Sequence, residues 1–395
     1  MQNKKPLLII LGLGVYLLSS GLSFAGFTAL AKKSGLTSPL PDGQSGSAMQ
    51  NLNRKVLVDV AGSQTEACPL NGAKFTKVER TIWETRRPLA VMIENHLEAR
   101  SQSGLADADV IYETIAEGGI TRFMALFYCR AAAYESILGP VRSARTYFLD
   151  WASEYNEPLY AHVGGANTPG PANALGQIND YGWGSANDLN QFSIGYPTFW
   201  RDYERLGRTV ATEHTMYSTT EKLWAVGLSR DYTNVDPDNK EWAKGFIPWK
   251  FSKEEADLAG RGDIQAINYT FWEDPNYAVS WQYDKTNNVY KRSNAGQPHL
   301  DLNINEQLSV KTVVVQLAVE KRANDGYEGN LHLLYGTTGK GQALIFSNGQ
   351  AIKGTWAKAK RLSRTIFYDE QGKEIQFNPG RIWISVLSVD TKVDY

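Results

Sequence analysis

Three arginines are the residues of this chain best suited to binding an anion. Arg142 and Arg145 stand three residues apart after a Gly-Pro pair, and Arg122 opens an apolar run. Each guanidinium offers paired donors to a phosphate or a carboxylate, and a helix beginning near Arg142 would add free backbone N–H groups. The alternative is that the arginines are structural and pair with carboxylates between layers of the fold. Those carboxylates would be Glu113, Glu117 or Asp150.

A second group of candidate residues follows a predicted strand. Glu94, Asn95 and His96 combine a carboxylate, an amide and an imidazole, which could ligate a divalent metal or transfer a proton. Alternatively, Asn95 and His96 only cap the turn that follows. His162 is a further candidate for ligand binding, although a lone histidine is more often structural, and the same holds for His214.

Complete catalytic signatures are missing from the sequence. It holds no His-Glu-x-x-His run, no Cys-x-x-Cys pair and no Gly-x-Ser-x-Gly elbow, and its Gly164-Gly165 pair lacks the Lys and Ser/Thr of a phosphate-binding loop. We therefore predict no cofactor, with a divalent metal only if the protein transfers phosphoryl groups. The formal net charge is -1, so the composition does not point to nucleic acid as a partner.

The N-terminal 33 residues predict a membrane-targeting segment. Two lysines precede the uncharged run Leu7–Ala31, and two more follow it. The run is long enough to cross a bilayer, which takes about 20 residues, but Ser23-Phe24-Ala25 also fits a signal-peptide cleavage site. The segment is either an uncleaved anchor in the cytoplasmic membrane or a cleaved signal peptide. With either, the folded part lies outside the cytoplasm, held by a single N-terminal span or secreted.

The two cysteines agree with an exported protein. Cys68 and Cys129 are the only cysteines in the sequence, and an even number in an oxidising compartment predicts one disulfide. The alternative is two buried free thiols. No cysteine follows the apolar run, so a lipid cannot be attached at a lipobox.

Hydrophobic patterning predicts an α+β fold. Apolar and β-branched runs predict strands, and apolar residues at helical spacing predict helices, one of which ends at Gly118-Gly119. The predicted strands are 87–93, 121–128, 159–163 and 313–319, and the predicted helices are 106–117, 143–155 and 219–227. Residues 164–205 form a long loop rich in aromatic residues, which favours function over disorder. Hairpin turns are predicted at 284–288, 348–349 and 371–372.

The chain is expected to contain two domains of different class. We expect a layered mixed α/β N-terminal domain followed by a mainly antiparallel β C-terminal domain. In the first part of the chain predicted strands alternate with helices, whereas in the second part strands are separated by hairpin turns. The predicted layout is an anchor or signal at 1–33, a flexible linker and turn at 34–76, the N-terminal domain at 77–228, an interdomain connection at 229–262 and the C-terminal domain at 263–395.

Several segments together resemble the YerB-like family of bacterial lipoproteins, which consists of domains of unknown function. The segments are Arg87–His96, Glu117–Phe123, Gly139–Arg145 and Tyr160–Gly165, and for the C-terminal domain Gly341–Phe346, Gly354–Trp356 and Asn378–Gly380. The resemblance covers roughly Arg87 to Val386. It implies a layered α+β fold and an envelope location, with no established activity. The chain departs from the family pattern at Ser101, where a proline is expected, and in lacking the lipobox cysteine, so that a transmembrane helix must replace the lipid anchor.

Two functions from different classes follow from these observations. The first is a binding or scaffold module of the bacterial envelope, whose arginines and aromatic loop hold an anionic ligand, a glycan or a protein partner. The second is a phosphotransferase, because the order of Glu94, Arg122, the Arg142–Arg145 turn and His162 is similar to that in the LytR-CpsA-Psr envelope phosphotransferases. That resemblance implies a lipid-linked anionic substrate. An enzyme requires Glu94 and the three arginines to converge in one cleft; without a complete catalytic signature, the binding module is favoured.

Overall fold

The computed structural model describes residues 54–253, 255–329 and 331–395. The predicted anchor and residues 34–53 of the predicted linker lie outside these ranges. Within the described ranges, no helix combines the length and apolar character needed to cross a membrane.

The described residues belong to one compact unit, 49–395, built on a ten-stranded mixed sheet. Its strand order is β24-β23-β22-β19-β25-β5-β6-β4-β8-β9. The bounds of these strands are β4 Leu89–Glu94, β5 Val110–Glu117, β6 Ile120–Phe127, β8 Leu159–His162, β9 Asp188–Asn190, β19 Thr312–Ala318, β22 Gly339–Ser347, β23 Gln350–Lys358, β24 Ile366–Asp369 and β25 Ile382–Ser388. The strands predicted near β4, β6, β8 and β19 are therefore confirmed.

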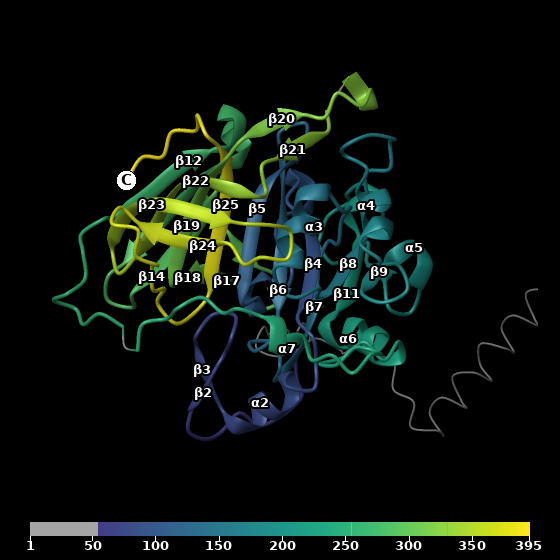
Figure 1. The fold of residues 1–395 in the computed structure, drawn as a ribbon, viewed down its shortest axis with the longest axis horizontal. Coiled ribbons are helices and arrows are strands. Elements are labelled where there is room, and N and C mark those ends of the chain that lie inside the picture. Colours follow the sequence, from purple (N-terminus) through teal and green to yellow (C-terminus); the bar gives the residue numbers. More distant parts are fainter. Residues whose placement is uncertain (1–53, 254, 330) are drawn as a thin grey trace, which may run out of the picture. The chain divides into compact units, whose positions relative to one another are not determined.

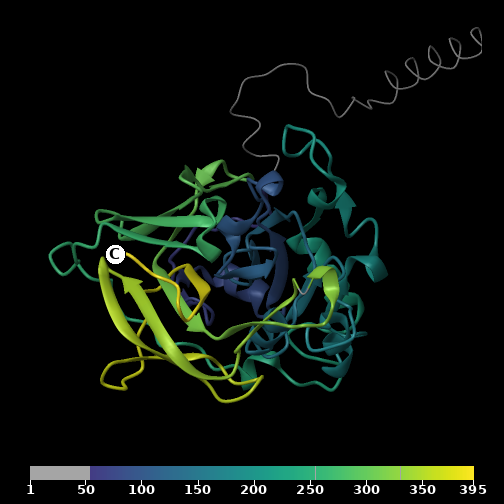
Figure 2. The same ribbon diagram turned by 90° about the horizontal axis from the view of Figure 1, so that it is seen from above.

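The ten-stranded sheet joins the two predicted domains. Strand β25 of the C-terminal half pairs in parallel with β5 of the N-terminal half, with Ile382 opposite Val110. Figure 1 shows the blue strands β4, β5 and β6 at the centre and the green and yellow strands β19 and β22–β25 continuing the same sheet; the view in Figure 2 shows the two halves in contact. The α+β class is confirmed, with a mixed N-terminal half and a mostly antiparallel C-terminal half.

Strand β5 replaces the helix predicted at 106–117. Seven of its eight residues are buried, because neighbouring strands cover both edges and further layers cover both faces. Tyr112 stacks on Trp151 of α3 on one face, and Glu113 contacts Arg292 on the other. A strand buried on both faces shows no polar alternation, so its apolar spacing can imitate that of a helix. Gly118 and Gly119, predicted to end a helix, both have positive φ and form the hairpin turn to β6.

Smaller sheets complete the unit. One sheet has the order β1-β7-β11-β10, another the order β12-β13-β14-β15 with β18 paired to β14, and three two-stranded sheets join β2 to β3, β16 to β17 and β20 to β21. Their bounds are β1 Arg54–Val56, β2 Glu66–Ala67, β3 Lys74–Phe75, β7 Tyr134–Leu138, β10 Trp200–Arg201, β11 Met216–Thr219, β12 Ala266–Thr270, β13 Ala278–Asp284, β14 Val289–Asn294, β15 Gln297–Pro298, β16 Leu300–Asp301, β17 Glu306–Gln307, β18 Ser309–Val310, β20 Glu320–Arg322 and β21 Leu333–Tyr335.

Helices are few and short in the described residues. Their bounds are α2 Lys77–Trp83, α3 Thr146–Ser153, α4 Ala174–Asp180, α5 Gln191–Ile194, α6 Thr220–Ser229 and α7 Trp242–Gly245. Helices α3 and α6 confirm two of the predicted helices, and α6 begins where the Thr219 hydroxyl accepts a hydrogen bond from the N–H of Lys222. The aromatic loop 164–205 contains α4, α5, β9 and β10.

Residues 54–76, predicted to belong to a flexible linker, instead contain three short paired strands. Strand β1 pairs with β7, and β2 and β3 form a hairpin around the turn at Cys68–Gly72. Cys68 is disulfide-bonded to Cys129, as predicted. Gly72 has a φ of +69°, and a Cβ there would lie 2.3 Å from the ring of Phe251, so a side chain cannot be accommodated.

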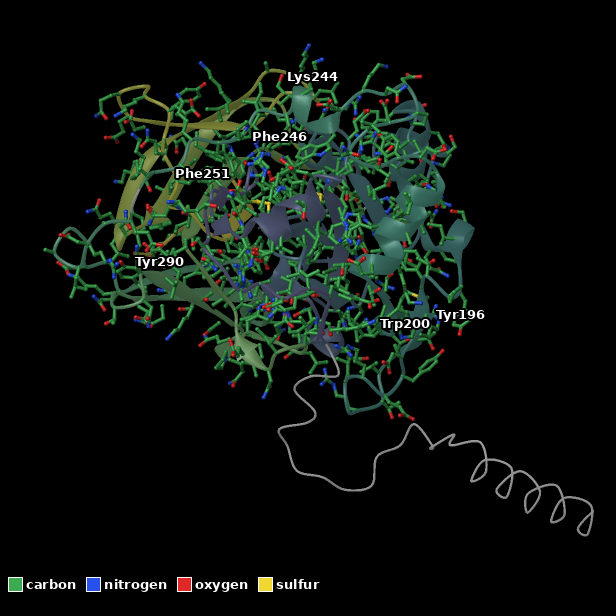
Figure 3. The ribbon with its side chains drawn as sticks, turned by 90° about the horizontal axis from the view of Figure 1, so that it is seen from below. Tyr196, Trp200, Lys244, Phe246, Phe251 and Tyr290 are labelled. Carbon is green, nitrogen blue, oxygen red and sulfur yellow. A yellow bond between two sulfur atoms is a disulfide. The ribbon has the colours of Figure 1, made fainter. Side chains whose placement is uncertain are left out.

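The connection between the two halves lies along the surface of the unit. Figure 3 labels Lys244, Phe246 and Phe251 from this segment. Trp242 packs against Tyr128 with 5.0 Å between ring centroids, and the N–H of Ser252 donates to the carbonyl of Phe377 at 2.9 Å. The connection is therefore attached to both halves.

Candidate functional site

Glu94 lies at the centre of a buried group of charged residues. It ends β4, directly opposite Arg122 on β6. One carboxylate oxygen lies 3.1 Å from Nε of Arg142, and the other lies 2.8 Å from Nδ1 of His214. The structure thus brings together Glu94 and two of the predicted arginines, with His214 as an added partner.

Glu117 forms ion pairs with both Arg122 and Arg145. Nη2 of Arg122 donates to one oxygen of Glu117 at 3.2 Å, and Nε of Arg145 donates to the other at 2.7 Å. Burial opposes the ionisation of Glu117, but the charges of Arg122 and Arg145 and their hydrogen bonds outweigh it and lower its pKa to about 2. Arg122 also donates to the carbonyl of Ser143 at 3.0 Å. Both arginines are buried and have the structural partners that the alternative interpretation requires.

Arg142 is held where it can face a ligand. Its N–H donates to the carbonyl of Met92 at 2.9 Å, and its carbonyl accepts from the N–H of Val163 at 3.0 Å, so the segment lies between β4 and the end of β8. Its side chain is 25% exposed, whereas those of Arg122 and Arg145 are 2% and 8% exposed. Of the three predicted arginines, Arg142 lines a pocket.

That pocket has a volume of about 620 Å³ and lies at the aromatic loop. Its charged lining residues are Arg142, Arg201 and Glu213, and its polar ones include Asn167 and Asn190. The two glycines 164 and 165 bring backbone to the pocket wall, and a Cβ at Gly164 would lie 2.9 Å from the ring of Phe192. We refer to this cavity as the loop pocket.

Phe192 and Arg201 are functional candidates that the sequence did not single out. Phe192, on α5, is 76% exposed although it lines the loop pocket. Arg201, on β10, donates to the carbonyl of Thr212 and to the hydroxyl of Thr215, and it forms no ion pair within the described chain. Tyr196, which is 84% exposed, and Trp200 lie at the same edge of the molecule in Figure 3. The density of aromatic residues in 164–205 was the available signal for Phe192, and no sequence signal distinguished Arg201.

His96 and His214 form a stacked pair beside Glu94. Their ring centroids lie 4.6 Å apart, at an interplanar angle of 7°. The hydrogen bond with Glu94 raises the pKa of His214, while burial and the neighbouring His214 lower the pKa of His96. Nδ1 of His96 accepts from the N–H of Glu98 at 3.3 Å, which is the capping role given as the alternative for this residue.

Asn95 lies inside the protein and does not reach the loop pocket. It is fully buried and donates to the hydroxyl of Thr121 at 2.7 Å, and its carbonyl oxygen accepts from Arg100, Gln102 and Asn294 at 3.0, 3.0 and 3.1 Å. These partners satisfy both ends of the amide, so the geometry favours a structural role.

His162 is also fully buried. Its ring nitrogens lie 2.5 Å from Oδ1 of Asp188 and 2.6 Å from the carbonyl oxygen of Gly164. The side chain therefore connects β8 to β9 and the glycine turn that forms the wall of the loop pocket. This arrangement matches the structural alternative and gives His162 an indirect part in shaping the pocket.

Within the described residues, one group of three side chains has its possible metal-ligand atoms close enough together to hold an ion. The ligand atoms of Cys68, Asp109 and Cys129 lie within 4.8 Å of one another. Both sulfurs are joined in the disulfide and cannot act as thiolate ligands, and Asp109 already accepts from the N–H groups of Tyr128 and Cys129 at 2.8 and 2.9 Å. The donor set therefore does not fit a metal ion while the disulfide is formed.

Comparison with known proteins identifies the family. Residues 75–233 match the family described as "Protein of unknown function (DUF3048) N-terminal domain", and residues 267–384 match its C-terminal domain. The chain belongs to this family. The matched ranges lie near the predicted domain limits, and they confirm the YerB-like resemblance.

Two further likenesses are consistent with this family. The chain is 28% identical over 320 residues to "Putative lipoprotein YerB" of Bacillus subtilis (strain 168), covering 81% of this chain and 85% of that protein. The crystal structure of the YerB protein from Bacillus subtilis is similar with a TM-score of 0.66 and 24% identity, covering 84% of this chain and 100% of that one. This structural likeness shows that the fold is shared.

Proposed function

We propose that this chain is an extracytoplasmic envelope protein whose loop pocket binds an acidic glycan. The observation that carries the proposal is that Arg201, without an ion-pair partner in the described chain, lines the same pocket as the exposed ring of Phe192. A cation and an exposed aromatic ring are the two groups that recognise a sugar carrying a carboxylate or phosphate.

The composition of the pocket wall supports a glycan over a small inorganic anion. Asn167, Asn190 and Ser143 provide hydrogen-bonding groups, and Arg142 has part of its charge balanced by Glu94. A volume of about 620 Å³ falls in the range of ligand-sized pockets. The exposed Tyr196 nearby would extend the contact to a second sugar ring.

The location rests on the family and on the N-terminal sequence. A relative in the family bears the name of a lipoprotein, and this chain has a long uncharged run at its N-terminus without a following cysteine. We propose that this run anchors the chain in the cytoplasmic membrane, or directs its secretion if it is cleaved, with the folded unit outside the cytoplasm.

The phosphotransferase alternative has less support from the geometry. It needs Glu94, Arg122 and Arg145 to meet a substrate, but Glu94 binds Arg142 and His214, and the two arginines bind Glu117. Those partners would have to be displaced before a phosphoryl group could take their place. A scaffold role with a protein partner has no specific contact to favour it.

The test is binding of a disaccharide that contains N-acetylmuramic acid, measured by titration calorimetry on the full-length chain. Arg201→Gln should weaken binding by roughly 1.5–3 kcal/mol, the range for a hydrogen bond to a charged group. Phe192→Ala should weaken it by about 1 kcal/mol through the lost contact with the sugar ring.

Matched variants separate binding from folding. Arg80→Gln and Leu228→Ala alter an exposed arginine and an exposed apolar residue outside the pocket, and they should leave the affinity unchanged. Chitobiose, which has no acid group, should bind more weakly than the acidic disaccharide and should not respond to Arg201→Gln. Equal binding of the disaccharide by the wild type, Arg201→Gln and Phe192→Ala would contradict the proposal.

A further inference from the structure

A second cavity of about 620 Å³ lies between the N-terminal hairpin and the C-terminal strands. It is formed by β1, β3 and α2 on one side and by β14, β18 and the loop before β25 on the other. In Figure 1 the purple segment with β2, β3 and α2 lies close to the strands β14 and β18. The loop contains Asn378-Pro-Gly380, a segment that resembles the family and that takes no part in the loop pocket. We refer to this cavity as the basic cavity.

The charged lining of the basic cavity is mostly positive. Its basic residues are Arg54, Lys74, Arg130, Lys253, Lys311 and Arg381, and its acidic residues are Glu79 and Glu255. Glu79 is occupied by the start of α2, because its carboxylate accepts from the N–H and hydroxyl of Thr76 at 2.8 and 2.9 Å. Glu255 pairs with Lys311 at 2.8 Å. Glu255 is therefore neutralised by Lys311, and Glu79 forms no ion pair with the cations of the cavity in the described chain.

Arg54 also has a partner outside the cavity. Its Nη2 lies 2.8 Å from Oδ1 of Asp107, and its guanidinium lies 3.5 Å from the centroid of the Tyr134 ring. Arg54 and Lys311 thus each have a carboxylate partner within the protein and do not need a ligand to balance their charge.

Arg381 and Arg130 lack such partners. Within the described residues no hydrogen bond or ion pair reaches the guanidinium of Arg381, and its Nε is buried without an acceptor. Arg130 forms no ion pair there, and its guanidinium donates only to the carbonyl of Ala106, at 3.3 and 3.4 Å. Burial and then the charge of Arg130 lower the pKa of Arg381 to about 9, against the opposing effect of Asp107, Asp301 and Asp109. Lys74 and Lys253, both exposed, form no ion pair within the described chain either.

We propose that the basic cavity binds a ligand that carries two or more phosphate or phosphodiester charges. Like charges that face one cavity repel each other, so the arrangement is stabilised when an anion bridges the cations. Arg130 and Arg381 offer paired donors that match the oxygens of phosphate. The volume exceeds what one phosphate needs, and four of the lining cations, Lys74, Arg130, Lys253 and Arg381, form no ion pair with a carboxylate in the described chain.

This site contrasts with the cluster around Glu94 and Glu117. There each buried arginine has a carboxylate partner, and the cluster is complete without a ligand. The basic cavity shares no residue with the loop pocket, and the inference does not depend on the glycan proposal.

The test uses two soluble probes on the full-length chain, in calorimetry and thermal unfolding. Inorganic pyrophosphate represents a free phosphate ligand, and a short-chain cardiolipin, which carries two phosphodiester charges, represents a lipid headgroup when used below its micelle concentration. We expect one of them to bind and to raise the melting temperature, with an affinity that falls as salt is added. Arg381→Met should weaken that binding roughly tenfold or more, and Lys253→Gln by a smaller factor.

The stability of the free protein distinguishes a binding residue from a structural one. Because Arg381 has no partner in the described chain, Arg381→Met should leave the melting temperature of the free protein unchanged or raise it, while the increase caused by the probe disappears. Lys340→Gln, which alters an exposed lysine on β22 outside the cavity, is the matched control for Lys253→Gln and should bind the probe as the wild type does. Binding of pyrophosphate supports the soluble source, and binding of the lipid alone supports the headgroup. Binding of neither probe, or binding that Arg381→Met and Lys253→Gln leave intact, would overturn the proposal.

Discussion

Nη2 of Arg292 donates to both carboxylate oxygens of Glu113, at 2.9 and 2.8 Å, and both side chains are fully buried. Arg292 lies on β14 in the C-terminal half and Glu113 on β5 in the N-terminal half, so the ion pair crosses the boundary between the family's two domains. The guanidinium also lies 4.6 Å from the centroid of the Trp383 ring, and its Nη1 lies 2.6 Å from Nδ1 of His299. This polar network inside an apolar interface fixes how the β12–β14 sheet lies on β5.

Arg292→Met should therefore destabilise the whole unit. Removing one partner leaves Glu113 charged and buried, which typically costs about 3–5 kcal/mol. Urea unfolding followed by tryptophan fluorescence measures the change. Lys291→Met, on the same strand but at an exposed ion pair with Asp284, is the control and should cost under about 1 kcal/mol. The double variant Glu113→Gln with Arg292→Met should recover part of the lost stability. A double variant whose loss of unfolding free energy equals the sum of the two single losses would show that the ion pair does not couple the halves.

Cleavage of the connection should leave the two halves associated. Leu258 is 58% exposed, and we expect thermolysin to cut first within 255–262, inside the predicted connection 229–262. Because β25 continues the sheet at β5, the fragments should elute together in gel filtration and separate only in denaturant. First cuts inside Val310–Val319, or fragments that separate without denaturant, would contradict this arrangement.

Glu117 should make the stability of the protein depend on acidic pH. Its pKa of about 2 lies below the ordinary 4.5, so the ionised form stabilises the fold fully above pH 4.5 and this contribution is lost as the pH falls toward 2. Glu117→Gln should lower the free energy of unfolding at pH 7 by on the order of 3 kcal/mol, from the size of the shift. The difference between wild type and variant should shrink below pH 4.5 in urea unfolding curves. A difference that stays constant from pH 7 to pH 3 would show that the charge of Glu117 is not what the two arginines require.

The disulfide should contribute measurably to stability. Cys68 and Cys129 are 61 residues apart, and closing a loop of that length stabilises by roughly 4 kcal/mol in the chain-entropy model. The variant with Cys68→Ser and Cys129→Ser should unfold at lower urea, and reducing agent should shift the wild type to the same midpoint without affecting the variant. Alkylation of two thiols in the native, unreduced protein would rule out the bond.

The sequence alone determined features that depend on neighbouring residues or on residue type. Apolar runs located β4, β6, β8 and β19, Asn348-Gly349 located the β22–β23 turn, and the even cysteine count predicted the disulfide. The positions of Glu94, Arg122 and Arg142 at predicted strand ends and after the Gly139-Pro140 turn also predicted that these residues lie together.

Tertiary structure decided which side chains are satisfied and which are free. Strand β5 could not be told from a helix until β25, which pairs Ile382 with the distant Val110, was known to cover its edge. Arg122, Arg145 and Arg381 are the same residue type, but two of them meet Glu117 and the third faces a cavity among other cations. Whether a charged side chain is structural or available for a ligand depends on which distant carboxylates the fold brings within a few ångströms of it. That distance cannot be read from the neighbouring residues in the sequence.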